Sequence, residues 1–134
     1  MSEGPGTAPA EAGDAAAAEV PARPLRLSIL LAVIGLMNLA GLARGLTGRA
    51  QLLAEIPQLS PTLFSVWLAA ALLAIAGAIG LWNLRRWGLY LLGLSWAVAV
   101  VVDVIIGATN HAFLATGIMW LLVLFVRPVR SALK

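Results

Sequence analysis

The side chains most capable of chemistry in this chain lie in one short stretch, VVDVIIGATNH, which ends at His111. It places a carboxylate, Asp103, within a long apolar segment and follows it with Asn110 and with His111, the only histidine. A charge at the centre of a membrane-spanning helix costs about 2.5–3.5 kcal/mol, and such charges usually pair or face a cavity. Asp103 is therefore expected to serve in a structural ion pair, or as a proton or cation acceptor assisted by His111 and Asn110.

Arg44 is the partner that helix geometry favours for Asp103. At a rise of about 1.5 Å per residue, Asp103 lies about 24 Å along its helix from Trp87. By the same rise, Arg44 lies about 27 Å along its helix from Arg26. We expect Arg44 and Asp103 to share one depth in the outer leaflet and to form an ion pair. Such an ion pair would not exclude a function of Asp103 as a proton or cation acceptor.

Three further positions within the apolar segments are candidates for polar contacts or pocket lining. Asn38 lies midway along the first segment and is expected to hydrogen-bond across helices, with substrate orientation as the alternative. Ser95 and Trp96 share a helix face with Asp103 and are candidates for contacts there. Trp96 lies near mid-membrane, where it either packs in the core or lines a hydrophobic pocket.

The chain shows no catalytic constellation. It has no nucleophile beside a base, no close pair of carboxylates and no phosphate-cradling loop. A single histidine without cysteine provides no ligand set for a metal. The sequence predicts a protein that is not an enzyme and binds no metal and no cofactor.

Composition identifies the solvent that must surround these segments. Of 134 residues, 61% are hydrophobic and 11% charged, whereas ordinary soluble domains carry about 25% charged residues. A small soluble domain could not bury this apolar surface, so the solvent must be largely lipid. The net charge of +3 does not indicate nucleic-acid binding, because the arginines flank apolar runs and form no continuous face.

Four apolar segments predict an all-α polytopic membrane protein with four transmembrane helices in an up-down bundle. The segments are 25–45, 62–84, 87–107 and 111–126, against about 20 residues needed to span a bilayer. The Ala-, Gly- and Pro-rich residues 1–24 predict a disordered cytoplasmic tail. Residues 25–128 form the predicted transmembrane domain, and residues 129–134 a cytoplasmic C-terminal tail.

The long outer loop contains AQLLAEI, residues 50–56, which places apolar and polar side chains on opposite sides. This pattern predicts a short interfacial helix. Ser60 and Pro61 are typical of an N-cap and the first helical position, so the second span should begin there. The first two spans are rich in Gly and Ala and are expected to pack closely.

Basic residues predict the orientation. Seven lie on the side of the two termini and two, Arg44 and Arg49, on the other, so both termini should be cytoplasmic. We expect a multi-pass protein of a bacterial inner membrane. The basic residues that could attract anionic lipid headgroups are Arg85, Arg86, Arg127 and Arg130.

Three local features carry a resemblance: the R-P opening at Arg23, the L-S-P ending at Pro61, and the tryptophan-flanked R-R-W turn at Arg85. In these the chain resembles small, uncharacterised bacterial four-helix membrane proteins, and its layout is similar to that of DoxX-type proteins. The resemblance covers about residues 23–134. It implies the four-helix fold, but it implies no activity and identifies no site residues.

Two functions remain open from the sequence. The first is a non-catalytic accessory or assembly subunit of a larger membrane complex; the second is a small oligomeric transporter or channel with Asp103 in a polar path. The expected partners are the lipid bilayer and other membrane subunits or a second copy, with no nucleic acid. A sealed ion pair at Asp103 would argue against transport, and a water-filled cavity that reaches Asp103 would argue for it.

Overall fold

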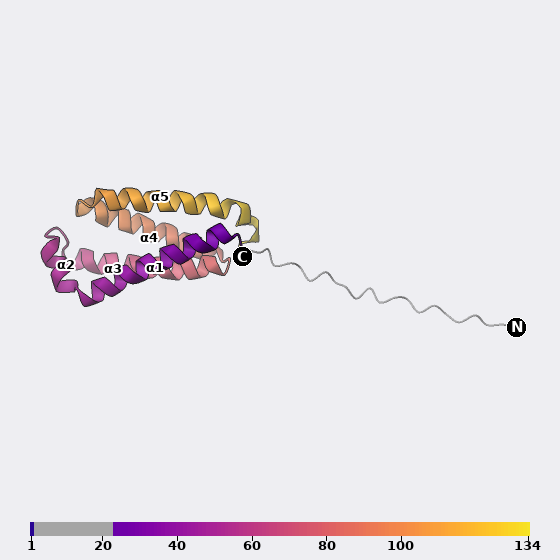
Figure 1. The fold of residues 1–134 in the computed structure, drawn as a ribbon, viewed down its shortest axis with the longest axis horizontal. Coiled ribbons are helices and arrows are strands. Elements are labelled where there is room, and N and C mark those ends of the chain that lie inside the picture. Colours follow the sequence, from indigo (N-terminus) through magenta and orange to yellow (C-terminus); the bar gives the residue numbers. More distant parts are fainter. Residues whose placement is uncertain (2–22) are drawn as a thin grey trace.

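The computed structural model describes Met1 and residues 23–134, and within these it is a helical bundle without strands (Figure 1). The elements are α1 (Leu25–Thr47), α2 (Arg49–Glu55), α3 (Pro61–Trp82), α4 (Arg86–Ile105), α5 (Thr109–Val126) and the 3₁₀ helix η1 (Arg127–Ala132). Four helical segments are long and apolar enough to cross a membrane, the last being α5 continued by η1. The predicted four-span, all-α fold is confirmed. Most of the predicted tail, residues 2–22, lies outside the described residues.

The two ends of the bundle differ (Figure 1). At one end, called the terminal end, lie the first turn of α1, the α3–α4 turn and η1. At the other, called the α2 end, lie α2 and the α4–α5 turn. This arrangement is the up-down topology that short connections impose on neighbouring helices.

Local sequence explains how α2 and α3 begin. Leu52 and Leu53 of α2 are half-buried while Gln51 and Glu55 are exposed, which confirms the predicted interfacial helix. The Ser60 hydroxyl accepts a hydrogen bond from the backbone N–H of Leu63 at 3.2 Å, and a proline follows at the first helical position. The predicted start of the second span is confirmed.

The closest helix packing joins α3 to α4. A Cβ atom added to Gly88 would collide with backbone atoms of Leu81, Gly80 and Gly77. A Cβ on Gly77 would lie 2.9 Å from the Gly88 carbonyl oxygen. Glycine on both helices thus allows their backbones to meet, as small residues do between helices in lipid. The predicted packing of the first two spans also occurs, since Gly45 of α1 lies against Leu68 and Trp67 of α3.

A buried apolar core closes the terminal end. Its largest side chains are fully enclosed: Leu27, Leu31, Leu81 and Leu122. Residues 129–134, expected as a tail, pack against this core instead, with Val129 and Leu133 buried. The Lys134 N–H donates to the Leu84 carbonyl at 2.9 Å, and the Arg86 N–H donates to the Lys134 carbonyl at 2.8 Å. The C-terminus is therefore fastened to the α3–α4 turn.

Candidate functional site

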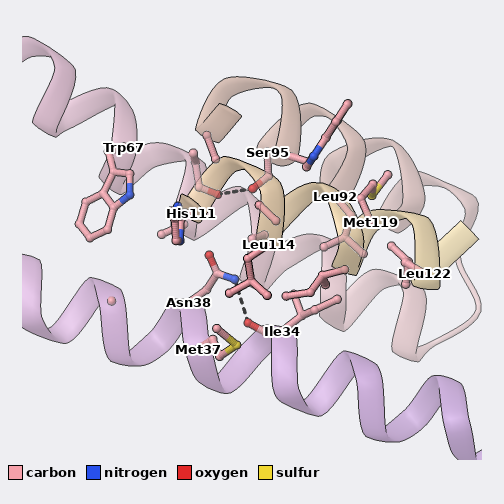
Figure 2. A pocket seen from close by; sticks show the side chains of 18 residues that line it. Ile34, Met37, Asn38, Trp67, Leu92, Ser95, His111, Leu114, Met119 and Leu122 are labelled. Carbon is pink, nitrogen blue, oxygen red and sulfur yellow. Dashed lines mark hydrogen bonds between the residues drawn. The ribbon is translucent and has the colours of Figure 1, made fainter. Parts of the chain in front are cut away.

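A cavity of about 220 Å³ lies between α1, α3, α4 and α5, from mid-bundle toward the α2 end (Figure 2). Its walls are largely apolar, with Met37, Trp67, Leu92, Leu114 and Ile118 among them. Three polar side chains from three helices also line it, Asn38, Ser95 and His111, beside the indoles of Trp67 and Trp96. The core described above lies between the cavity and the terminal end, so the cavity is a blind recess.

Small side chains and the course of α1 explain why space remains here. On α1, the core-facing residues Leu31 and Ile34 are buried, but Asn38 and Gly41 further along the same face are only half-buried. Opposite them the lining residues of the other helices include alanines: Ala70, Ala71 and Ala74 of α3, Ala99 of α4 and Ala115 of α5. Small residues facing a helix that packs less closely leave a void that lipid or a ligand can enter.

Asp103 and His111 meet at the α2 end of this cavity. Asp103 Oδ2 lies 2.6 Å from His111 Nδ1. The Asp103 side chain is 3% exposed and that of His111 is 54% exposed. The carboxylate is therefore buried behind an imidazole that borders both the cavity and the exterior.

The α4–α5 turn holds this pair in place. The Ala108 N–H donates to the Asp103 carbonyl at 2.7 Å, and the Gly107 N–H donates to the Val104 carbonyl at 3.3 Å. Gly107 has a φ of 77°. This pattern is a Schellman motif, and its left-handed position favours glycine. The motif brings the last turn of α4 beside the first turn of α5, so that the two side chains meet. The positive end of the α5 helix dipole also favours a carboxylate at this point.

The pair fixes which nitrogen of His111 is available to a ligand. When the Asp103 carboxylate is ionised it only accepts hydrogen bonds, and Nδ1 of His111 then carries the proton. Nε2 has no hydrogen-bond partner among residues 23–134. In a neutral imidazole Nε2 accepts a hydrogen bond, and in the imidazolium it donates one.

Arg44 has a different partner from the one predicted. Its Nη2 lies 3.7 Å from Glu55 Oε2 of α2, with side chains 70% and 47% exposed. The predicted Arg44–Asp103 ion pair is thus corrected, since each residue pairs elsewhere. Helix rise places two residues at one depth but does not fix the face of the helix on which each lies. An exposed pair such as Arg44–Glu55 contributes about 0–1 kcal/mol.

Asn38 also departs from its prediction. Its Nδ2 donates to the Ile34 carbonyl of its own helix at 2.8 Å, rather than to a neighbouring helix (Figure 2). Its Oδ1 has no hydrogen-bond partner within residues 23–134. Because Asn38 lines the cavity, this oxygen is an acceptor available to a molecule there.

Ser95 and Trp96 form part of the wall between α3, α4 and α5. The buried Ser95 hydroxyl donates to the Ala70 carbonyl of α3 at 2.8 Å (Figure 2). Trp96 Nε1 lies 3.4 Å from Thr116 Oγ1 of α5. Ser95, a candidate for polar contacts on the Asp103 face, thus bonds the backbone of α3 rather than Asp103, and Trp96 lines the cavity.

The remaining predicted site residues lie outside the cavity. Asn110 is exposed in the first turn of α5 and does not line the cavity. The arginines predicted to meet lipid headgroups, Arg85, Arg86, Arg127 and Arg130, are all exposed at the terminal end. Arg86 Nε also donates to the Leu133 carbonyl at 3.0 Å, so this arginine helps to fasten the C-terminus. Within residues 23–134, no group of three His, Asp or Glu side chains could hold a metal ion.

Comparisons with protein families, curated proteins and solved structures find no match to this chain. The resemblance to DoxX-type proteins therefore stays an expectation. The function has to be argued from the cavity itself.

Proposed function

We propose that this protein is a membrane-embedded binding protein for a small, mostly apolar molecule that carries a hydrogen-bond donor, such as a phenolic or indolic compound. The observation that supports this most directly is the recess of about 220 Å³, with two polar groups left unpartnered among the described residues. These are Oδ1 of Asn38 and Nε2 of His111. Few polar groups in an apolar pocket are typical of sites that orient a small ligand.

The volume limits the size of the ligand. An apolar cavity of about 150 Å³ holds benzene, and pockets for drug-sized molecules occupy about 300–1,000 Å³. A recess of about 220 Å³ therefore suits one aromatic ring with a short substituent. Such a ligand makes few contacts, so its Kd should lie between the micromolar and millimolar ranges.

Two acceptors select the polar end of the ligand. When His111 is neutral, Nε2 and the Asn38 oxygen both accept hydrogen bonds, so a hydroxyl or N–H group is favoured. Asp103 acts as a positioning residue, because it holds the imidazole in one tautomer and contacts the ligand only through His111. Trp67 and Trp96 supply aromatic faces against which a ring can pack.

Helix packing suggests how the ligand enters. α1 packs mainly on α3, and α5 mainly on α4, whereas α1 and α5 touch each other little. The seam between α1 and α5 is therefore the weakest part of the wall, and a lipophilic molecule could pass through it from the bilayer. The exposed edge of His111 offers a second route from the α2 end.

The distribution of charge supports an orientation. Of the nine basic residues, only Arg44 and Arg49 lie at the α2 end, and the other seven lie at the terminal end. By the positive-inside rule the terminal end would face the cytoplasm of a bacterial cell, and the recess would open toward the outside of the inner membrane.

The binding proposal bears on both functions predicted from the sequence, transport and service as an accessory subunit. A cavity bordered by His111, the partner of Asp103, favours transport. The apolar core at the terminal end, however, closes any path through one copy of the protein. Transport would then require α1 or α5 to move. The accessory-subunit function stays a prediction, because no feature of residues 23–134 selects a protein partner.

A cavity-filling pair of variants tests the proposal. Ala99 lines the cavity, whereas Ala97, two residues earlier on α4, is exposed on the lipid side. Calorimetric titration of the detergent-solubilised protein with indole and 4-fluorophenol should show saturable binding. Ala99→Phe should abolish it and Ala97→Phe should leave it intact. Equal affinity of both variants, or uptake that never saturates, would show that these probes only partition into detergent and would contradict the proposal.

A further inference from the structure

A second site lies at the terminal end, between the start of α1 and the end of α5. A groove of about 520 Å³ is formed there by Pro24, Leu25, Arg26, Leu124, Phe125 and Pro128. Five of these residues are apolar, and Arg26 provides the single charge. The groove lies at the opposite end from the recess at His111 and shares no residue with it.

Among residues 23–134, the charged side chains at this end of the bundle are all basic. Seven basic residues belong to the terminal end, and the two acids of residues 23–134, Glu55 and Asp103, lie at the α2 end. Two of the seven are engaged by the fold itself: Arg23 bonds Ser28 and stacks on Trp82, and Arg86 bonds the Leu133 carbonyl. Arg26 and Arg127 make no salt bridge within the described range. Arg26 lines the groove, and Arg127 directly precedes Pro128, which also lines it.

We propose that this groove binds one anionic phospholipid, with its phosphate at Arg26 and Arg127 and an acyl chain along Leu124 and Phe125. Charge complementarity selects the headgroup, since basic residues at a membrane surface attract anionic lipids. The apolar floor selects a lipid over a soluble phosphate, because it offers contacts only to a hydrocarbon chain. Leu25 and Leu124 are 74% and 51% exposed, and a bound acyl chain would cover both.

Native mass spectrometry of the full-length protein tests this site. The probes are phosphatidylglycerol and phosphatidylcholine with identical acyl chains, added in equal amounts to delipidated protein in a mild detergent. The expected result is one retained phosphatidylglycerol per chain, in preference to phosphatidylcholine. Arg26→Gln should reduce this preference about fivefold, and Arg49→Gln, which removes the same charge at the α2 end, should leave it unchanged.

A second pair of variants separates the groove from general charge. Leu124→Trp fills the groove and should lower retention of both lipids, whereas Leu121→Trp, on the exposed surface beside it, should not. Millimolar inorganic phosphate should fail to displace the lipid. Equal effects of Arg26→Gln and Arg49→Gln, equal retention of the two lipids, or displacement by phosphate would each overturn the proposal.

Discussion

Asp103 Oδ2 and His111 Nδ1 lie 2.6 Å apart across the turn that joins α4 to α5. This pair explains how a carboxylate is accommodated within an apolar helix. The charge is shielded by an imidazole from the next helix, and the imidazole in turn borders the recess. The carboxylate for which the sequence left an ion pair and an acceptor function open thus orients an imidazole that borders the recess.

A double-mutant cycle should show that these two residues are coupled. Replacing Asp103 by Asn or His111 by Gln removes one partner of the pair formed by the buried carboxylate and the partly exposed imidazole, so each single variant should lower the unfolding free energy by about 1–3 kcal/mol. Their combined loss should fall short of the sum by about 0.5–3 kcal/mol. Reversible unfolding in bicelles measures these values.

Arg44 supplies the control for that cycle. Arg44→Gln combined with Asp103→Asn should be additive within about 0.5 kcal/mol, because the two residues have separate partners. Strong coupling of Arg44 to Asp103, with none between His111 and Asp103, would restore the ion pair predicted from sequence and contradict the observed one.

Binding of a donor-bearing probe should depend on His111. The probe needs Nε2 of His111 as a hydrogen-bond acceptor, so His111→Gln, which removes the imidazole, should give a weaker affinity for 4-fluorophenol. Calorimetric titrations of both proteins measure this. An unchanged affinity in that variant would exclude His111 as the acceptor.

Replacing Gly88 and Gly117 by alanine should change the unfolding free energy in opposite directions. Gly88→Ala forces a methyl group into the α3 backbone and should cost about 1–3 kcal/mol or more. Gly117 of α5 has open space around its Cα, so Gly117→Ala should stabilise the helix by about 0.5–1 kcal/mol. Thermal unfolding in detergent compares the two. A neutral Gly88→Ala would mean that α3 and α4 do not approach as closely as the structure shows.

Cysteine labelling tests the topology, and the chain has no cysteine of its own. Cysteines placed at Gln51 of α2 and Ser131 of η1 lie at opposite ends of the bundle. In intact cells an impermeant maleimide should label position 51 and reach position 131 only after the membrane is opened. Labelling of both positions in intact cells would contradict the four-span arrangement.

The span pattern was predictable because it depends on local hydrophobicity and on helix-end signals such as Ser60-Pro61. For Asp103 the sequence favoured Arg44 as the ion-pair partner and named His111 only as an assisting residue. The choice between them depends on how α4 turns into α5. The signal was present in Gly107, whose left-handed φ closes a Schellman motif. Such a tight turn places the residue four positions before that glycine beside the first turn of the next helix.

The recess could not be predicted from the sequence. Alanines in α3 indicate close packing, and α3 does pack closely on α4 through Gly77 and Gly88. Whether facing alanines leave a void depends on the angle at which α1 crosses the bundle, which no local pattern encodes. Asn38, half-buried beside the recess, was expected to bond across helices but bonds the Ile34 carbonyl of its own helix.

The most direct test of the binding function is ¹⁵N NMR of the imidazole, since His111 is the only histidine. Before ligand is added, the spectrum should show a protonated Nδ1 and an unprotonated Nε2 in the neutral form. Saturating 4-fluorophenol should shift the Nε2 resonance, because it then accepts a hydrogen bond, and Ala99→Phe should remove this shift while Ala97→Phe retains it. An Nε2 resonance that the probe leaves unchanged, in a protein whose Nδ1 is bonded to Asp103, would contradict a ligand site at this recess.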